Sequence, residues 1–369
     1  RIPVRSSSEW VVTGNWGKWC EIRQESGEKV DTLVLDVGVN IARQERGISL
    51  ELSNREETLE IELRQVAATE EYEYVLPVIF HVLYRVPEDD VPVGYLSSCL
   101  ERVNELYRDG PVDMNLKFVL ATHDPNGQLL EEPGVRREFR EELPMDMFDF
   151  VGNKFGDCAW VWDPKEYINV VIFDSKSIPS GCAHFPYLPE SVVLPGVLFS
   201  DWYADHLPDA HVHCVAWNRS HMFSRYELLG VIFDYDVFTL AHEMGHYLGL
   251  LHPFVDGKGN FGDYCDDTPD YCVNGYETFL SELDETFPYS DDNYRKVIQR
   301  VALNGRVFIA DNIMDYEFGY LDRFTLEQRK RVRTVLENAW LLPGPKIEVE
   351  PRARSGKKAV KPSVPKPVS

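Results

Sequence analysis

The stretch that decides how this chain is interpreted is Thr-Leu-Ala-His-Glu-Met-Gly-His-Tyr-Leu-Gly-Leu-Leu-His, residues 239–252. His242 and His246 are four residues apart, so on a helix their side chains lie one above the other on the same face. Gly249 tolerates left-handed backbone angles and lets the chain leave the helix sharply. The turn that follows is expected to bring His252 round as a third ligand for the same metal ion.

Three neutral imidazoles with a fourth position left to water form the ligand set of a catalytic zinc site, not of a structural one. Glu243 follows the first histidine, so it can reach that water without binding the metal. The bare His-Glu-x-x-His motif is moderately specific, but the extended His-Glu-x-x-His-x-x-Gly-x-x-His motif is far more selective. The alternative is an ordinary amphipathic helix with hydrogen-bonded histidines, and the spacing argues against it. We therefore expect Zn²⁺ at His242, His246 and His252, with Glu243 as the catalytic base.

The composition is that of an acidic globular protein. With 369 residues, 44% of them hydrophobic and 12% aromatic, the chain has room for two domains and a real core. The net charge of -23 argues against nucleic acid as a partner, because a phosphate backbone requires clustered Lys and Arg. No stretch is apolar for long enough to predict a transmembrane segment.

The chain begins with Arg1 and not with Met, so we expect that a segment with a signal peptide or a lipid anchor has been removed. This predicts an extracytoplasmic protein, either secreted or held at the cell surface as an outer-membrane lipoprotein. The seven cysteines are scattered, unlike those of a small disulfide scaffold. Cys265 and Cys272 are close enough to bridge a loop, and both a disulfide and two free thiols are compatible with their spacing.

The N-terminal part of the chain has the pattern of a small β-domain. Residues 1–9 are polar and predict a linker. Across residues 10–70, short alternating segments are separated by Gly, Asn and charged turns, which predicts an antiparallel β-sandwich. Alternation is clearest at 32–39, 48–53 and 59–64.

This domain is similar to the BACON module, an immunoglobulin-like domain common at the N-termini of Bacteroidetes surface proteins. The matching features are Trp10, Trp19-Cys20-Glu21-Ile22, Ser26-Gly27, a strand that ends at Asn40, Arg46-Gly47-Ile48 and a last strand that closes on Gln65. The resemblance implies binding of surface glycans, with Trp16 and Trp19 as stacking surfaces. The alternatives are aromatic residues of a core, and a spacer that holds the next domain away from the cell surface.

Residues 71–342 predict a second domain in which a mixed sheet is combined with helices, an α+β catalytic domain. The expected elements are strands at 75–86, 115–121, 167–173 and 192–200, and helices at 93–108, 294–303 and 325–341, together with the helix that carries His242 and His246 and ends at Gly249. Thr325 and Gln328 have the spacing of a capping box at the start of the last helix. Residues 343–369 are rich in Pro and Lys and predict a disordered basic tail.

Several segments outside the histidine motif resemble one family. They are an opening strand at 76–82, a central strand at 162–170, the entry to a substrate-binding edge strand at 181–186, a loop at 262–269, a methionine turn at 312–316 and the start of a last helix at 324–325. Residues 75–340 thereby resemble a pappalysin-family (cytophagalysin-like) metzincin, as in Bacteroidetes zinc-dependent metalloproteinase lipoproteins. A long insertion at 277–310 departs from the family pattern.

The resemblance implies further site residues. Met314 is implied as the structural floor of the metal site, and Tyr316 as a residue that stabilises the oxyanion, with a core tyrosine as the alternative. The resemblance also implies a bound Ca²⁺ whose oxygen ligands come from Asp263, Asp267 and Thr268. The alternative is a solvated acidic turn. We expect an extended peptide to add to an edge strand at 192–200.

The sequence therefore predicts a secreted or surface-anchored zinc endopeptidase that acts on proteins or peptides and follows a small β-sandwich. The competing interpretation is a carbohydrate-binding or adhesion protein that carries an inactive metzincin domain. The intact Glu243 and the three histidines argue against it, because a degenerate site usually loses one of these residues first.

Overall fold

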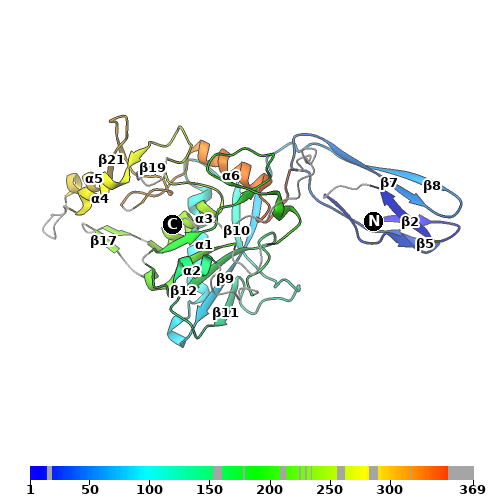
Figure 1. The fold of residues 1–369 in the computed structure, drawn as a ribbon, viewed down its shortest axis with the longest axis horizontal. Helices are drawn as coiled ribbons and strands as arrows, with labels where there is room; N and C mark the ends of the chain where they lie inside the picture. Colours follow the sequence, from blue (N-terminus) through cyan, green and yellow to red (C-terminus); the bar gives the residue numbers. More distant parts are fainter. Residues whose placement is uncertain are drawn as a thin grey trace. The chain divides into compact units, whose positions relative to one another are not determined.

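The computed structural model describes residues 1–14, 19–152, 160–177, 179–207, 213–223, 226–228, 231–233, 235–255, 262–281, 290–316 and 318–347. These residues divide into two compact units, the first formed by Arg1–Tyr72 with residues 345–347 and the second by Glu73–Gly344. The rest of the predicted tail, residues 348–369, lies outside the described residues. Figure 1 labels the elements of both units.

The first unit contains β-strands and no helix within its described residues. Its strands are Ile2–Arg5 (β1), Trp10–Gly14 (β2), Cys20–Ile22 (β3), Ser26–Gly27 (β4), Val30–Leu33 (β5), Leu35–Val37 (β6), Arg46–Ser53 (β7) and Thr58–Gln65 (β8). A four-stranded antiparallel sheet has the order β4-β2-β7-β8, and β1 pairs with β5 and β3 with β6. The core consists of Val4, Trp10, Val12, Leu33 and Leu50.

For this unit the structure corrects one expectation and selects one alternative. Residues 1–9 are not only a linker, because Ile2 and Val4 alternate as in a strand, and β1 places Val4 in the core. Trp19 is only 7% exposed, and the guanidinium of Arg46 lies 4.6 Å from the centroid of its ring. Trp19 therefore offers no open surface for a sugar, and Trp16 lies outside the described residues.

The second unit is built on a six-stranded mixed sheet. Its strands are Tyr74–Tyr84 (β9), Leu116–Leu120 (β10), Val135–Phe139 (β11), Ile168–Phe173 (β12), Gly181–Ala183 (β13) and Cys214–Asn218 (β16). The order is β10-β9-β12-β16-β13, and β11 pairs with the second half of β9. All pairs are parallel except β13 with β16, which is antiparallel. The apolar run of β9 is explained by this central position, since parallel strands are covered on both faces.

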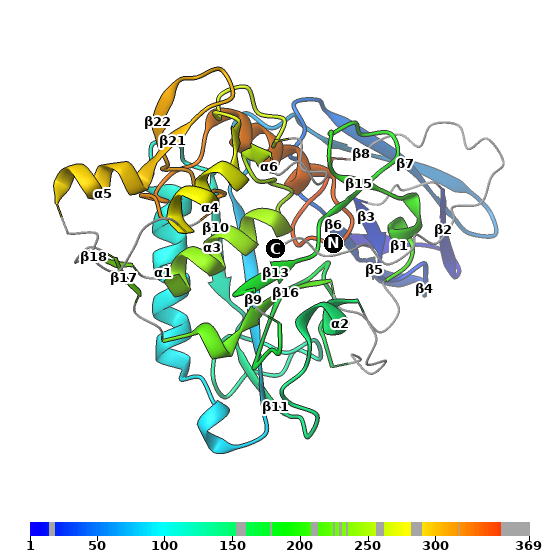
Figure 2. The ribbon, with the colours of Figure 1, turned by 60° about the vertical axis from the view of Figure 1, so that its left-hand side comes forward.

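Helices cover both faces of this sheet (Figure 2). Val93–Arg108 (α1) has the predicted bounds, and its Tyr107 hydroxyl donates to the carbonyl of Ala241 in Tyr235–Tyr247 (α3) at 2.9 Å. Met147–Val151 (α2) packs with Cys182, Val171 and Phe173. Because Gly181, the neighbour of Cys182, faces α3, helices α2 and α3 lie on opposite faces of the sheet.

Shorter elements surround this core. They are Tyr187–Leu188 (β14), Leu198–Phe199 (β15), Tyr226–Leu228 (β17), Val231–Phe233 (β18), Phe254–Val255 (β19), Tyr271–Cys272 (β20), Val273–Ser281 (α4), Asp291–Ile298 (α5), Gln299–Val301 (β21), Val307–Ile309 (β22) and Leu326–Asn338 (α6), with 3₁₀ turns at Pro87–Asp89, Asp201–Ala204 and Arg219–His221. The capping box of Thr325 and Gln328 is present at α6, which ends at Asn338 and not at Leu341. Among the described residues, the helices are all too short or too polar to cross a bilayer.

Two predicted elements differ from the structure. The helix expected at 294–303 ends at Ile298, and the chain continues as the β21–β22 hairpin, whose turn contains Gly305 at φ +84°. The strand expected at 192–200 is extended only at Leu198–Phe199, because a turn with Gly196 at φ +76° precedes it. The outer strand of the main sheet beside α3 is β13.

Candidate metal centre and active site

Helix α3 ends in a turn that requires glycine. Gly249 has φ +87°, and the amide of Leu250 donates to the carbonyl of Gly245 at 2.9 Å, as in a Schellman motif. A Cβ atom at Gly249 would also lie 2.7 Å from Cγ2 of Val335 in α6. The turn reverses the chain and returns His252 to the helix face that carries the first two histidines.

The three histidines converge on one point. His252 Nε2 lies 3.1 Å from His242 Nε2 and 3.0 Å from His246 Nε2. All three side chains are buried. Within the part of the chain that the structure describes, they are the only group of three or more His, Cys, Asp or Glu residues whose ligand atoms come together.

The hydrogen bonds of these rings leave a site for a cation. His242 Nδ1 is 2.9 Å from the carbonyl of Ile313, and His246 Nδ1 is 2.8 Å from the carbonyl of Leu250. A carbonyl only accepts, so each Nδ1 carries the proton and each Nε2 directs a lone pair at the centre. Burial lowers the pKa of His242 to about 4 and holds the pKa values of His246 and His252 well below the ordinary value for histidine. At these last two residues the neighbouring imidazoles add to the effect. Neutral imidazoles with outer hydrogen bonds of this kind fit Zn²⁺.

Glu243 follows the first of these ligands in the sequence and is buried beside them. Its side chain is buried, and burial raises its pKa well above the ordinary value for glutamate. Its Oε2 atom has no hydrogen-bond partner among the described residues. A carboxylate of raised pKa is a stronger proton acceptor when ionised, so the surroundings of Glu243 suit a general base.

The methionine turn lies directly beneath α3. Met314 is fully buried, and a Cβ atom at Gly245 would lie only 2.3 Å from its sulfur. The amide of Met314 donates to Oδ1 of Asn312 at 2.9 Å. Asn312 in turn exchanges two side-chain hydrogen bonds with Gln328 of α6, at 2.8 and 3.0 Å. The turn is thereby attached to both helices.

Tyr316 follows this turn and lies against the histidines. The centroid of its half-buried ring is 4.5 Å from the ring centroid of His252 and 5.8 Å from that of His242. The structure therefore brings Tyr316 together with the three predicted ligands.

Of the three predicted calcium ligands in the acidic loop, the structure brings only two together. Oδ1 of the buried Asp263 accepts from the Thr268 hydroxyl at 2.7 Å and from the Cys265 amide at 3.0 Å. Asp267 is exposed, and its Oδ2 accepts from the amide of Glu327 at 3.0 Å in the first turn of α6. Asp267 therefore caps a helix, while Asp263 and Thr268 bind each other.

Of the two alternatives left open for Cys265 and Cys272, the structure has the free thiols and not the disulfide. Cys265 is buried, and its sulfur donates to the carbonyl of Asp263 at 3.6 Å. Cys272 is exposed on β20. Each thiol has its own environment, and the spacing of the two residues alone does not reveal this.

Gly181 on β13 begins the segment 181–186 that the resemblance implies as the entry to the substrate strand, but the sequence does not reveal its contact with Glu243. A Cβ atom there would lie 2.6 Å from Cγ and 3.0 Å from Oε1 of Glu243. We expect Gly181→Ala to displace the carboxylate and to lower kcat by about 10- to 100-fold, since a shift of about 1 Å can have an effect of that size. Zinc content should not change. Steady-state kinetics and metal analysis check this, with Gly94→Ala on α1 as the control because that position has open space. A normal kcat for Gly181→Ala would show that β13 does not position Glu243.

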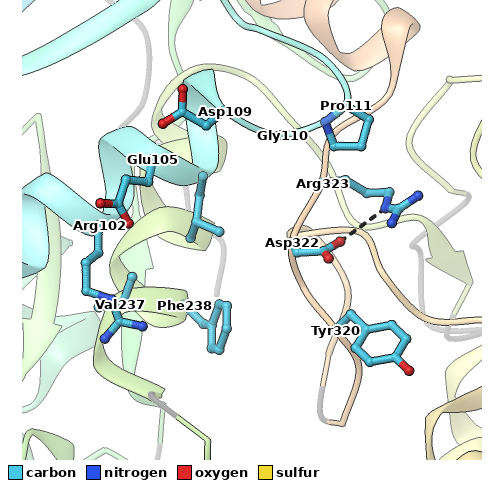
Figure 3. Close-up of a pocket in the computed structure, with 11 residues that line it drawn as sticks. Arg102, Glu105, Asp109, Gly110, Pro111, Val237, Phe238, Tyr320, Asp322 and Arg323 are labelled. Carbon is cyan, nitrogen blue, oxygen red and sulfur yellow. Dashed lines mark hydrogen bonds and ion pairs between the residues drawn. The ribbon is translucent and has the colours of Figure 1, made fainter.

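A separate cavity of about 360 Å³ lies between α1, α3 and the loop after the methionine turn. Figure 3 shows charged and aromatic residues around it, with Arg102, Glu105 and Asp109 on one side and Tyr320, Asp322 and Arg323 on the other. Arg323 is already bound to Asp311 and Asp322 at 3.2 and 3.1 Å. Neither the histidines nor Glu243 line this cavity, so it is not part of the metal centre.

Sequence comparison finds a peptidase family model and a metalloprotease that are similar to this chain. Residues 157–337 match the peptidase family model described as pregnancy-associated plasma protein-A. An extracellular metalloprotease of Verticillium alfalfae is 27% identical over 241 residues, which cover 59% of this chain and 70% of that protein.

A solved structure shares the fold. A mutant of Tannerella forsythia promirolysin is 20% identical with a TM-score of 0.50, over 74% of this chain and 84% of that one. Mature mirolysin from the same organism, in complex with a cleaved peptide, is 21% identical with a TM-score of 0.48, over 72% of this chain and 92% of that one.

Proposed function

This chain belongs to the pappalysin family of metalloproteases, and we propose that it is a zinc endopeptidase in which Glu243 is the general base. The observation that carries the proposal is the set of three buried imidazole nitrogens that converge on one point beside a buried carboxylate. Zinc bound there would act as a Lewis acid and lower the pKa of its water towards about 7.

In this mechanism Glu243 would carry out both proton transfers, and Tyr316 would stabilise the oxyanion. Glu243 would accept a proton from the attacking water and deliver it to the nitrogen of the leaving amine. Its raised pKa favours holding the proton between these two events. The Tyr316 hydroxyl would donate a hydrogen bond to the oxyanion, which the contact of its ring with His252 supports. The substrate would lie extended along β13, the outer strand that touches Glu243.

Digestion of an unfolded protein by the zinc-loaded full-length chain tests this function. We expect cleavage that a chelator stops and that added zinc restores, with internal cleavage sites identified by mass spectrometry. A chain that binds one zinc ion but cleaves no protein would instead support an adhesion protein with an inactive metzincin domain.

We further propose an extracytoplasmic location, secreted or lipid-anchored, because the Verticillium relative is described as extracellular. For the first unit we propose a role as a BACON-like spacer, without a sugar platform at Trp19, since that ring is covered by Arg46. Glycan binding elsewhere on this unit stays a prediction. A glycan array with the full-length chain and a Trp16→Ala variant tests it.

Calcium at the acidic loop also stays a proposal, supported by the buried oxygens of Asp263 and Thr268. At a calcium concentration 100 times the Kd, binding would stabilise the fold by about 2.7 kcal/mol. Removal of calcium with zinc retained should then lower the unfolding temperature by about 5–10 °C. Differential scanning calorimetry measures this, and Asp263→Asn should abolish the difference. Equal unfolding temperatures with and without calcium in the wild-type chain would refute the site.

A further inference from the structure

Arg300 is a buried cation in the insertion at 277–310, and it binds the backbone next to the metal centre. It lies on β21 and is only 2% exposed. Its Nη2 donates to the carbonyls of Tyr316 and Phe318, at 3.1 and 2.8 Å. Its Nη1 donates to the carbonyl of Val297 at 3.0 Å. The guanidinium thereby connects the insertion to the segment that follows the methionine turn.

Aromatic rings and one carboxylate surround this guanidinium. Its central carbon lies 3.3 Å from the ring centroid of Tyr276 on α4 and 5.6 Å from that of Tyr271 on β20. The hydroxyl of Tyr271 donates to Oδ1 of Asp315, which is also buried. A buried Arg is stable only when carbonyls, rings or an opposite charge compensate it, and all three are present here.

The same network holds Tyr316 from both directions. Oδ1 of Asp315 accepts from the amide of Tyr316 at 2.8 Å, and Arg300 donates to its carbonyl. The ring of Tyr316 packs against the stacked rings of Phe254 and His252, with centroid distances of 4.6 and 4.5 Å. With the peptide groups on both sides bound, the direction in which the ring leaves the backbone is fixed relative to His252.

We propose that Arg300 is a positioning residue, through which the insertion at 277–310 holds Tyr316 against the metal centre. This rests on the proposed function, in which the Tyr316 hydroxyl stabilises the oxyanion. The insertion, which departs from the family pattern, then forms part of the catalytic apparatus and is not a surface decoration. A merely structural role would make Arg300 important for folding but not for the contribution of Tyr316.

A double-mutant cycle separates the two roles. Arg300→Gln should lower kcat about tenfold or more with zinc content and KM nearly unchanged, since loss of one oxyanion donor costs about 10²–10³-fold. In a Tyr316→Phe background, the same substitution should change kcat by less than about twofold, because coupled residues are not additive. Arg300→Lys keeps the charge but not the planar fork, so its kcat should be intermediate. Arg306→Gln is the control, since Arg306 is an exposed cation on the same hairpin.

Hydrogen exchange of the zinc-free protein gives a readout that does not depend on activity. The amides of residues 315–318 should exchange faster in Arg300→Gln, while those of α1 should not. If Arg300→Gln does not fold, the same comparison is made with Arg300→Lys.

Equal fold-losses in the wild-type and Tyr316→Phe backgrounds, or unchanged exchange, would overturn the proposal. A Tyr316→Phe enzyme with normal kcat would overturn the role of Tyr316, and with it the catalytic meaning of the network. If the wild-type chain binds zinc but hydrolyses nothing, the proposed function fails, and exchange alone then decides whether Arg300 fixes this segment.

Discussion

Replacing Glu243 with glutamine should lower kcat by about 10²–10⁴-fold, the usual contribution of general acid-base catalysis, and leave one zinc ion per chain. Glutamine has the same size and can still form hydrogen bonds, but it cannot accept the proton of the attacking water. The three imidazoles are untouched, so the metal should remain. Kinetics on a quenched peptide and metal analysis of the same sample check both expectations. Glu101→Gln, an exposed change on α1, is the control.

Stability gives a second signature of the same substitution. The folded-state pKa of Glu243 is raised above that of an unfolded chain, so ionisation of this group destabilises the zinc-free fold as pH rises above the ordinary range for glutamate. Glutamine carries no such cost. Above that range, zinc-free Glu243→Gln should therefore unfold at a temperature equal to or higher than the wild type. A fully active Glu243→Gln enzyme would mean that another residue is the base.

Replacing His246 with alanine should remove metal and activity together. The His246 ring is fully buried, and its Nδ1 is fixed by the carbonyl of Leu250. Loss of an outer hydrogen bond alone costs metal sites about 10- to 100-fold in affinity, so loss of the ligand itself should exceed about 100-fold. Metal analysis after gel filtration, and activity titrated with zinc, measure this loss. The exposed His123→Ala is the control.

Comparison of the two variants is informative in itself, since Glu243→Gln should keep the metal and His246→Ala should not. A His246→Ala chain that still binds one zinc ion with wild-type affinity would show that the metal lies elsewhere.

Elements with a strong local signal could be predicted from the sequence. Helix α1 has the predicted bounds because its apolar residues follow a helical period, and α6 begins where Thr325 and Gln328 form a capping box. The segment after Ile298 forms a hairpin, although its apolar spacing resembles that of a helix. The pair Asn304-Gly305, a strong hairpin signal, marks the turn between β21 and β22.

In the candidate site, too, residues with a local sequence signal could be predicted, and contacts between different elements could not. Its histidines and Glu243 lie within one short stretch, so their spacing alone predicts the group that the structure brings together. The contact of Gly181 with Glu243 and the bonds of Arg300 to Tyr316 join residues on different elements. Such contacts depend on how strands pair and pack, which periodicity does not reveal.

The attachment of the methionine turn to the last helix has a consequence for biosynthesis. His242 is held by the carbonyl of Ile313, and that turn is bound through Asn312 to Gln328. A nascent chain that has released only the histidine helix therefore lacks the support of its metal centre. We therefore expect the centre to be complete only after Gln328 has left the ribosome and α6 has docked. On this expectation, hydrolytic activity arises late in synthesis, when little of the newly made protein remains unfolded and open to its own cleavage.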